Sequence, residues 1–286
     1  MVNKSTDVII IGAGPAGIAC AIQLKRYNID SIIFEKNEIG GLLKNANIVE
    51  NYLGFPNGIS GNKLVQLINK QSQTAKINVK YEIVMSVESF EDILKVKTSK
   101  NTYHSKYLVI ASGTIPIIPK VPIIRNDIID KVYFDIYQLR ETKGKKIVII
   151  GAGDCAFDYA LNLSDFNQVT ILNRSTHIKA LPILQERCFS SYNIQYLEKI
   201  SVLRIENVNN QLLLLCNNSE KLTADYLLIA IGRESNLDFI KKDLLKFQNI
   251  FQIGDVKTGQ FRQTSIATGD GTFTAMNIYK ILNQGD

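Results

Sequence analysis

The chain has 286 residues, of which 45% are hydrophobic and 21% are charged. This composition supplies enough apolar surface for a folded core and excludes a disordered chain, and the length favours two domains. The net charge of +6 is scattered along the sequence. The sequence has no arginine-rich or aromatic-basic stripe, which argues against a nucleic-acid-binding protein. The positive net charge suits acidic partners such as phosphorylated cofactors or acidic electron-carrier proteins.

The amino-terminal segment contains an apolar run of only four residues, 8–11, before glycines intervene. That run is too short for a signal peptide, and no segment approaches the ~18 apolar residues of a membrane span. The four cysteines lie far apart, at positions 20, 155, 188 and 216, which suits free thiols in a reducing compartment. We therefore expect a cytoplasmic protein with no membrane partner.

The first half begins with a strand over 8–11 that runs into Gly12-x-Gly14-x-x-Gly17 and then into a helix. The first glycine permits a tight turn, the second lets the backbone approach a pyrophosphate, and the third lets the helix lie close to the strand. Pro15 and Ala16 complete this turn. Glu35 ends an expected strand at 31–35, where a carboxylate would accept hydrogen bonds from ribose hydroxyls.

Next along the chain, alternating apolar residues over 79–98 predict a small antiparallel meander. The apolar segment 107–110 predicts a buried strand, which ends at the candidate cofactor-binding residues Ala111 and Gly113. Segment 114–122 contains three prolines, which disfavour both a helix and a regular sheet. We expect it to be a linker that crosses between two domains.

The second half repeats the same order of elements. The sequence from Gly151 through Gly153 to Ala156 follows an expected strand and begins a helix that contains Asp154 and Cys155. Alanine replaces the third glycine, which this fingerprint tolerates.

The next expected strand, 169–173, is followed by Arg174, where the first half has Glu35. An arginine can pair with a ribose 2′-phosphate that a carboxylate would repel, and Lys179 lies close enough to assist. The pattern favours NADPH over NADH. The alternative is that Arg174 is a surface charge and that the site takes NADH.

A second meander is expected over 195–215, followed by a buried strand at 226–229 that leads to Ile231 and Gly232. A last strand at 250–254 and a final helix complete the chain. The repeated strand–helix–strand order predicts parallel sheets. We therefore predict an α/β fold with two Rossmann-like dinucleotide-binding domains, each of three layers (ββα) with a small antiparallel meander.

A family resemblance rests on seven segments of the sequence. They are GAGPAG at 12–17, GGLLKNANIVENYLGFPNGISG at 40–61, ASG at 111–113, GAGDCAFDYA at 151–160, AIG at 230–232, IGDV at 253–256 and FRQTSIATGDG at 261–271. Together they resemble the low-molecular-weight thioredoxin reductases over nearly the whole chain. The resemblance implies a homodimer that takes FAD at the first site and NAD(P)H at the second. With the linker and a tail that returns to the first domain, we expect a discontinuous FAD-binding domain, 1–115 and 250–286, and an NAD(P)H-binding domain, 116–249. The resemblance also implies a set of residues near the flavin, which are Gly40, Gly41, Leu42, Asn51, Gly254, Asp255, Arg262, Gln263 and Thr264.

Thr264 is expected to start the last helix, whose free N–H groups would face the flavin. The simpler alternative is that Thr264 caps this helix through its own side chain.

One departure from that family decides the expected mechanism. Thioredoxin reductases carry a Cys-x-x-Cys pair just before the second glycine motif, whereas residues 131–146 contain no cysteine and the chain has no such pair anywhere. Without two neighbouring thiols there is no internal disulfide to reduce. Segment 131–160 is more similar to the thioredoxin-reductase-like ferredoxin–NADP reductases, which also lack the dithiol.

We therefore expect an FAD-dependent NAD(P)H oxidoreductase that has neither a metal nor a catalytic acid. Electrons would pass from the flavin to an external acceptor, such as ferredoxin, a small disulfide, a quinone or oxygen. Two alternatives stay open: a thioredoxin–disulfide reductase whose thiols come from elsewhere, and a non-catalytic flavin-binding module. Cys155, at a helix start, is a candidate redox thiol, although small-residue packing explains it more simply.

Overall fold

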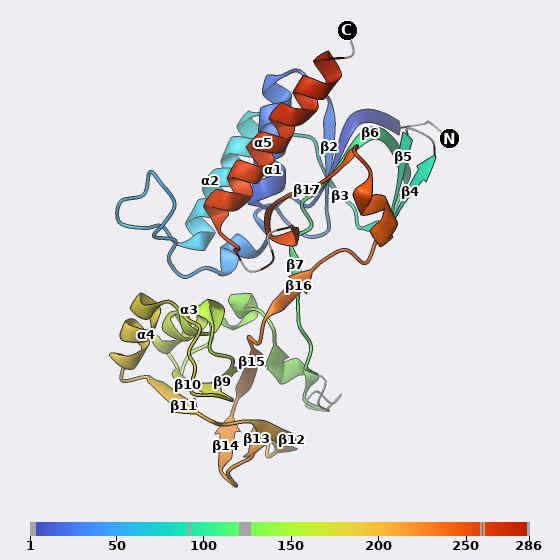
Figure 1. The fold of residues 1–286 in the computed structure, drawn as a ribbon. Helices are drawn as coiled ribbons and strands as arrows, with labels where there is room; N and C mark the ends of the chain where they lie inside the picture. Colours follow the sequence, from blue (N-terminus) through green and yellow to red (C-terminus); the bar gives the residue numbers. More distant parts are fainter. Residues whose placement is uncertain (1–3, 91–92, 120–126, 258, 260, 285–286) are drawn as a thin grey trace. The chain divides into compact units, whose positions relative to one another are not determined.

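The computed structural model describes residues 4–90, 93–119, 127–257, 259 and 261–284 (Figure 1). They divide into two compact units: Met1–Lys44, Ile48–Ile115 and Glu234–Asp286 form the first, and Asn45–Asn47 and Pro116–Arg233 form the second.

The first unit is built on a seven-stranded sheet with the order β3-β2-β1-β6-β5-β4, and β17 also pairs with β6. Strands β3, β2, β1, β6 and β17 are parallel, and β6, β5 and β4 are antiparallel. The strands are β1 (Lys4–Ile11), β2 (Ser31–Glu35), β3 (Val79–Tyr81), β4 (Val84–Phe90), β5 (Ile93–Thr98), β6 (Thr102–Ile110) and β17 (Ile250–Gln252). The helices are α1 (Pro15–Arg26), α2 (Gly61–Thr74) and α5 (Thr264–Asn283), with short 3-10 turns η1 (Gly41–Asn45), η4 (Lys242–Lys246) and η5 (Gly254–Val256).

Alternate residues of β1 divide the core of this unit into two layers. Val8 and Ile10 pack against α1 and α5, whereas Ile9 and Ile11 pack against the meander strands β4 and β5. Helices α1 and α5 approach closely at Gly271, where an added Cβ would lie 2.2 Å from a backbone oxygen of α1. This arrangement is the three-layer plan expected from the period-2 pattern of a buried strand.

The second unit repeats that plan. Its parallel sheet has the order β11-β10-β9-β15-β8, and a separate antiparallel sheet has the order β12-β13-β14. The strands are β8 (Val132–Tyr133), β9 (Lys146–Ile150), β10 (Gln168–Asn173), β11 (Ile194–Glu198), β12 (Val202–Val208), β13 (Gln211–Cys216), β14 (Lys221–Ala224) and β15 (Tyr226–Ile229). The helices are α3 (Asp154–Ser164) and α4 (Pro182–Phe189), with 3-10 turns η2 (Ile129–Lys131) and η3 (Ile136–Leu139). The predicted α/β class is confirmed in both units.

The structure corrects the predicted meanders. Each predicted meander includes one strand that does not belong to it. Strand β3 pairs in parallel with β2, and β11 pairs in parallel with β10. These short strands extend the parallel sheets, and the antiparallel segments start only at β4 and β12.

The return segment 234–249 was expected in the second domain, but it belongs to the first unit. The physical reason is that Ile240 is buried in the core of the first unit, with Leu237, Phe239, Leu244 and Leu245 packed around it. In the opposite sense, Asn45–Asn47 belong to the second unit although they were expected in the first domain.

The expected linker is more regular than predicted. Residues Thr114–Pro116 form strand β7, which pairs with β16 (Arg233–Ser235) as a two-stranded sheet. A proline is tolerated at the end of so short an edge strand, because few N–H donors are needed there. The rest of the linker beyond residue 119, including Pro122, lies outside the described residues.

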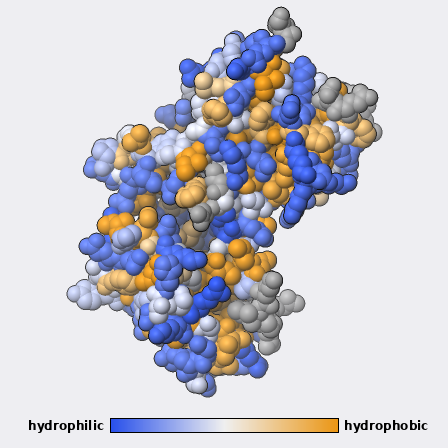
Figure 2. Space-filling model, viewed as in Figure 1, coloured by the Kyte–Doolittle hydropathy of each residue, from blue (hydrophilic) through white to orange (hydrophobic). Residues whose placement is uncertain are grey.

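The surface of each unit carries scattered apolar side chains among hydrophilic ones (Figure 2). Such scattering is ordinary for folded proteins. In the part of the chain that the structure describes, none of the helices combines the length and the hydrophobicity that a membrane span requires.

Candidate functional site

The first glycine turn is packed backbone against backbone on one side and open on the other. Gly12 has φ of +102°, and a Cβ there would lie 2.3 Å from the Ala111 oxygen; one at Gly17 would lie 2.0 Å from the Gly12 oxygen. A Cβ at Gly14 would meet nothing within 4 Å. Gly14 is also the N-cap of α1 and no side chain caps the helix. The turn therefore fits a pyrophosphate, which helix N–H groups and the helix dipole favour.

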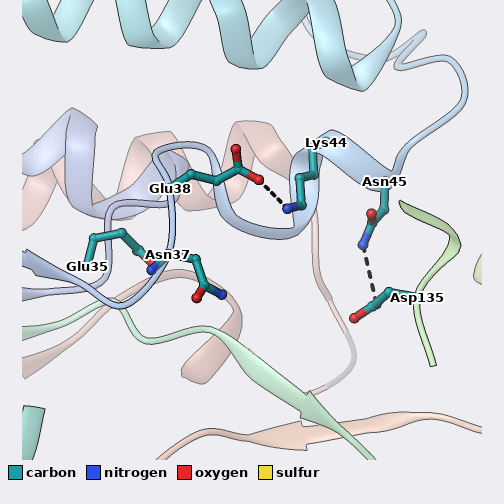
Figure 3. Close-up of polar contacts among 6 residues, drawn as sticks. All are labelled: Glu35, Asn37, Glu38, Lys44, Asn45 and Asp135. Carbon is teal, nitrogen blue, oxygen red and sulfur yellow. Dashed lines mark hydrogen bonds and ion pairs between the residues drawn. The ribbon is translucent and has the colours of Figure 1, made fainter. Parts of the chain in front are cut away.

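Glu35 lies beside this turn and is held by the backbone. Its Oε2 accepts a hydrogen bond from the Ala13 N–H at 2.8 Å, and its Oε1 accepts one from the Asn37 N–H at 2.9 Å. Figure 3 shows Glu35 with Asn37, and the Glu38–Lys44 ion pair of the same unit. Each carboxylate oxygen keeps a second lone pair, so Glu35 can still accept from ribose hydroxyls as predicted.

A cavity of about 360 Å³ opens at Glu35. Its walls are made by residues 11–12, 34–36, 82–85, 112, 236 and 238–239, all from the first unit. Sequence reasoning found Gly12 and Glu35 but missed the segments 82–85 and 236–239. Neither segment contains a motif, so only the tertiary fold brings them to the cavity.

The predicted flavin loop lies against the same glycine turn. The Gly40 N–H donates to the Ala13 oxygen at 2.9 Å, and a Cβ at Gly41 would lie 3.4 Å from the Gly14 Cα. Leu42 continues this loop within η1. Gly41 has φ of +56°, a conformation that favours glycine, so the Gly-Gly pair is required by the turn itself.

The start of α5 is tied to the second flavin segment. Asn51 donates from Nδ2 to Gln263 Oε1 at 2.9 Å, and Ser265 Oγ donates to the Asn51 oxygen at 3.4 Å. Thr264 is the first residue of α5, as predicted, but Gln263 is the N-cap and no side chain caps the helix. Capping by the Thr264 side chain, the simpler alternative, is therefore wrong.

The remaining predicted residues of the first site lie at two turns near α1 and α5. The Gly254 N–H donates to Asp270 Oδ2 at 3.0 Å, and a Cβ at Gly254 would lie 2.9 Å from the Ala16 Cβ. Asp255 follows in η5, and the half-buried Arg262 precedes α5. Pro15 is at the first turn of α1, and Gly113 accepts a hydrogen bond from the Asn236 N–H at 3.0 Å.

The second glycine turn reproduces the geometry of the first. Gly151 has φ of +142°, and a Cβ there would lie 2.2 Å from the Ala230 oxygen. Gly153 is the N-cap residue of α3, and no side chain caps this helix. A Cβ at Gly153 would meet nothing within 4 Å. Ala156 is fully buried, so its small side chain fills the place of the third glycine. Ile231 and Gly232 follow β15, as Ala111 and Gly113 follow β6.

The structure refines the comparison between Glu35 and Arg174. The Gly12 N–H donates to Phe34 and the Gly151 N–H donates to Leu172, so Asn173 occupies the place of Glu35, one residue before Arg174. Asn173 is buried, and its Nδ2 donates to the His177 oxygen at 3.0 Å and to the Tyr196 hydroxyl at 2.9 Å. The position that corresponds to Glu35 is therefore neutral in the second unit.

The basic loop after β10 is fastened to the second glycine turn. The Lys179 and Ala180 N–H groups donate to the Ala152 oxygen at 2.8 and 3.2 Å. The Leu181 N–H donates to Asp154 Oδ1 at 2.8 Å. The side chains of Arg174 and Lys179 are exposed on this loop. They can meet an anionic group bound at the turn.

Sulfur chemistry has little support at this site. Cys20, Cys188 and Cys216 are buried, and burial raises the pKa of Cys20 and of Cys188 to about 12. Cys155 is exposed, yet desolvation of its thiolate by the surrounding protein raises its pKa, with a smaller opposing effect of Arg233. This direction is opposite to the lowered pKa that is typical of reactive thiols at helix starts.

Segment 134–139 is a structural turn. Ile136 and Leu139 are buried in the core of the second unit. Asp135 forms an ion pair with Arg233 at 3.0 Å and accepts a hydrogen bond from Asn45 Nδ2 at 3.3 Å (Figure 3). Among the described residues, no group of three or more histidines, cysteines and carboxylates is placed to hold a metal ion.

Comparison with known proteins decides the family. The family model described as pyridine nucleotide-disulphide oxidoreductase matches residues 6–271. The chain belongs to the pyridine nucleotide-disulphide oxidoreductase family. It is 28% identical to thioredoxin reductase from Bacillus subtilis over 96% of this chain and 94% of that one. It is 25% identical to the "34.2 kDa protein in rubredoxin operon" of Clostridium pasteurianum, over 98% of both chains.

Among solved structures, thioredoxin reductase from Lactococcus lactis superposes with a TM-score of 0.88 at 25% identity, covering 98% of this chain and 99% of that one. Bacillithiol disulfide reductase from Bacillus cereus shares the fold, with a TM-score of 0.79 at 21% identity over 97% and 99% of the two chains. This pyridine nucleotide-disulphide oxidoreductase is accordingly an enzyme of the thioredoxin reductase type that uses FAD and NAD(P)H.

Proposed function

We propose that the enzyme passes electrons from NAD(P)H through FAD to an external acceptor without a thiol relay of its own. The observation that carries this proposal is the turn at 134–139. The segment before the second glycine motif holds no cysteine, and Ile136 and Leu139 anchor it in the core of the second unit. A turn anchored by two buried side chains supports a packing role for this segment rather than exchange of disulfides.

The first unit is proposed to hold FAD. Its open glycine turn fits the pyrophosphate at Gly14, and Glu35 at the cavity edge fits a ribose with free hydroxyls. A carboxylate at that place disfavours a 2′-phosphate, which matches FAD rather than NADPH. When bound, FAD supplies the two-electron acceptor chemistry that the side chains lack.

The flavin end of this site is proposed to lie between the 40–42 loop, Asn51 and the start of α5. The Asn51–Gln263 hydrogen bond fixes the segment before the helix. The first N–H groups of α5 are uncapped by side chains, so they give the helix start a partial positive charge. This partial positive charge would favour the negatively charged form of a flavin bound there. Such stabilisation requires no proton donor from the protein.

The second unit is proposed to bind NADPH in preference to NADH. Asn173 leaves the ribose position neutral, because its side chain is an uncharged amide, and its Nδ2 already donates to the protein. Arg174 and Lys179 lie on a loop that is hydrogen-bonded to the glycine turn. Two exposed cations near an anion site suit a 2′-phosphate.

The acceptor is proposed to be ferredoxin or another small redox protein of the cytoplasm. The net charge of +6 suits an acidic protein partner. A relative in Clostridium pasteurianum is described as a protein of a rubredoxin operon, which also supports a small electron carrier. We further propose a homodimer, which sedimentation of the purified protein tests.

The decisive experiment is anaerobic stopped-flow reduction of the purified yellow protein by NADPH and by NADH, followed by a panel of acceptors. We expect rapid bleaching of the flavin and faster reoxidation by ferredoxin than by thioredoxin, small disulfides, quinones or oxygen. Rapid NADPH-dependent reduction of thioredoxin would overturn the proposal. A flavin that neither nucleotide bleaches would instead indicate a binding module.

A further inference from the structure

Glu82 is a buried acid in the cavity wall that no sequence motif explains. Its side chain is only 9% exposed. The Tyr103 hydroxyl donates to its Oε1 at 3.0 Å, and the Thr98 hydroxyl donates to its Oε2. Tyr103 is fully buried, and its ring contacts Phe34, another residue of the cavity wall, at a centroid distance of 4.7 Å. Glu82 therefore belongs to a hydrogen-bonded network that lies behind the cavity wall, in the interior of the first unit.

Two lysines complete this network. Lys80 Nζ lies 5.3 Å from the centre of the Tyr103 ring, and Lys100 Nζ donates to the Tyr81 oxygen at 3.0 Å. Burial opposes ionisation of Glu82, but the two hydroxyl hydrogen bonds and the two lysine charges outweigh it and lower its pKa. A carboxylate can accept from both hydroxyls at once, whereas an amide would turn a donor toward one of them.

The network holds the connector between β3 and β4 in place. The Ser99 N–H donates to the Ile83 oxygen at 2.7 Å, and the Ile83 N–H donates to Ser99 Oγ at 3.2 Å. In the β4–β5 ladder, Val84 pairs with Thr98 and Ser86 pairs with Lys97, which leaves residue 85 as a bulge. A bulge residue keeps its backbone N–H and C=O outside the ladder.

The bulge and the connector face the cavity. Ile83, Val84 and Met85 all line it, together with Glu82. A flat heterocycle with donors and acceptors on its edge can be bound by backbone groups outside the ladder only if they are held in register. The Glu82 carboxylate, joined to Thr98 and Tyr103 of the neighbouring strands, supplies that constraint.

We propose that Glu82 is a positioning residue for the adenine end of FAD. With Tyr103 and Thr98 it clamps the connector 82–83 onto the turn at 98–101 and so sets the Met85 backbone of β4 in the cavity wall. This inference rests on the proposed FAD site in the first unit. It assigns Glu82 to binding through the connector, without contact between its carboxylate and the cofactor.

The test uses the full-length protein freed of FAD, with Glu82→Gln and Tyr103→Phe as variants. FAD binding is followed by flavin fluorescence. ADP binding, which reports the adenosine and pyrophosphate end alone, is followed by calorimetry. Because a connector released in either variant must be ordered again when the ligand binds, we expect both Kd values to rise by the same factor, up to roughly tenfold, which is about the worth of one hydrogen bond to a charged group. The double variant should be no worse than Glu82→Gln alone, since the two residues act as one unit.

Ser105→Ala is the matched control. Ser105 is also buried on β6, and its hydroxyl donates to the Tyr107 oxygen at 2.9 Å without touching the connector. We expect it to lower the melting temperature without changing either Kd. Unchanged Kd values in Tyr103→Phe, with a melting temperature lowered as in the control, would overturn the positioning role. If Glu82→Gln does not fold, Tyr103→Phe decides alone. Failure of the parent protein to bind either FAD or ADP would instead overturn the proposed function.

Discussion

Alanine at the second glycine of each fingerprint separates protein stability from cofactor binding. A Cβ at Gly14 or at Gly153 meets nothing within 4 Å, and both residues have extended backbone, with φ of −70° and −102°. As an N-cap, alanine is worse than glycine by about 0.5–1 kcal/mol. Removing a glycine from the unfolded chain gains about 0.4–1 kcal/mol. The two effects nearly cancel, so the free energy of unfolding should change by less than about 0.5 kcal/mol.

Binding should respond much more strongly. The added methyl group stands where a pyrophosphate must approach the uncapped helix start, so at least one hydrogen bond to a charged group is lost. Such a bond is worth about 1.5–3 kcal/mol, which corresponds to a rise in Kd of roughly 10- to 150-fold. We expect Gly14→Ala to weaken FAD only, and Gly153→Ala to weaken NADPH only.

Calorimetric titration of each full-length variant with FAD and with NADPH measures both effects, and thermal unfolding supplies the stability. Gly12→Ala is the contrasting control, because its Cβ would lie 2.3 Å from the Ala111 oxygen and should destabilise the fold as well. Equal weakening of both cofactors by either alanine at the second glycine would refute the assignment of one cofactor to each turn.

Three further outcomes are expected. Arg174→Glu should weaken NADPH by at least ~1–2 kcal/mol more than NADH, because a charge-assisted contact to the 2′-phosphate is lost; equal losses in parallel titrations would argue against that contact. In the native protein a thiol reagent should label Cys155 alone, since Cys20 and the other two cysteines are buried, and prior reduction by NADPH should expose no new thiol; a gain of two would reveal a disulfide. Burial opposes ionisation of Asp225, but hydrogen bonds led by the Lys146 N–H outweigh it and lower its pKa. The folding stability that ionised Asp225 contributes is present above its pKa in the unfolded chain and is lost as the pH falls through its pKa in the folded protein. The loss of unfolding free energy caused by Asp225→Asn near pH 7 should therefore shrink at about pH 3, and an equal loss at both pH values in urea titrations would contradict this.

Much of the fold could be predicted from the sequence, because it depends on local patterns of residues. The strand ending at Glu35, the two glycine turns and the start of α5 at Thr264 were all predicted, because period-2 apolar runs and glycines at strand–helix junctions act over a few residues. The three-layer plan followed from repeating these elements in the same order.

Other features depend on packing between distant segments. The cavity wall at 82–85 has no motif, and its bulge at Met85 appears only in the β4–β5 register. The return segment around Ile240 joined the first unit because its apolar residues fit that core. Counting residues from the glycine turn placed Arg174 opposite Glu35, whereas hydrogen bonding places Asn173 there. The segment from the first glycine to the end of the next strand is one residue shorter in the second half than in the first, and the hydrogen bonding of the fold reveals this.

Anaerobic reductive titration of the yellow protein addresses the absence of a sulfur relay most directly. A chain with no redox-active dithiol should be fully reduced by about two electron equivalents per bound flavin, with the visible absorbance falling in proportion from the first addition. Uptake of about four equivalents, with the flavin colour retained until a second centre is filled, would show that a disulfide takes part.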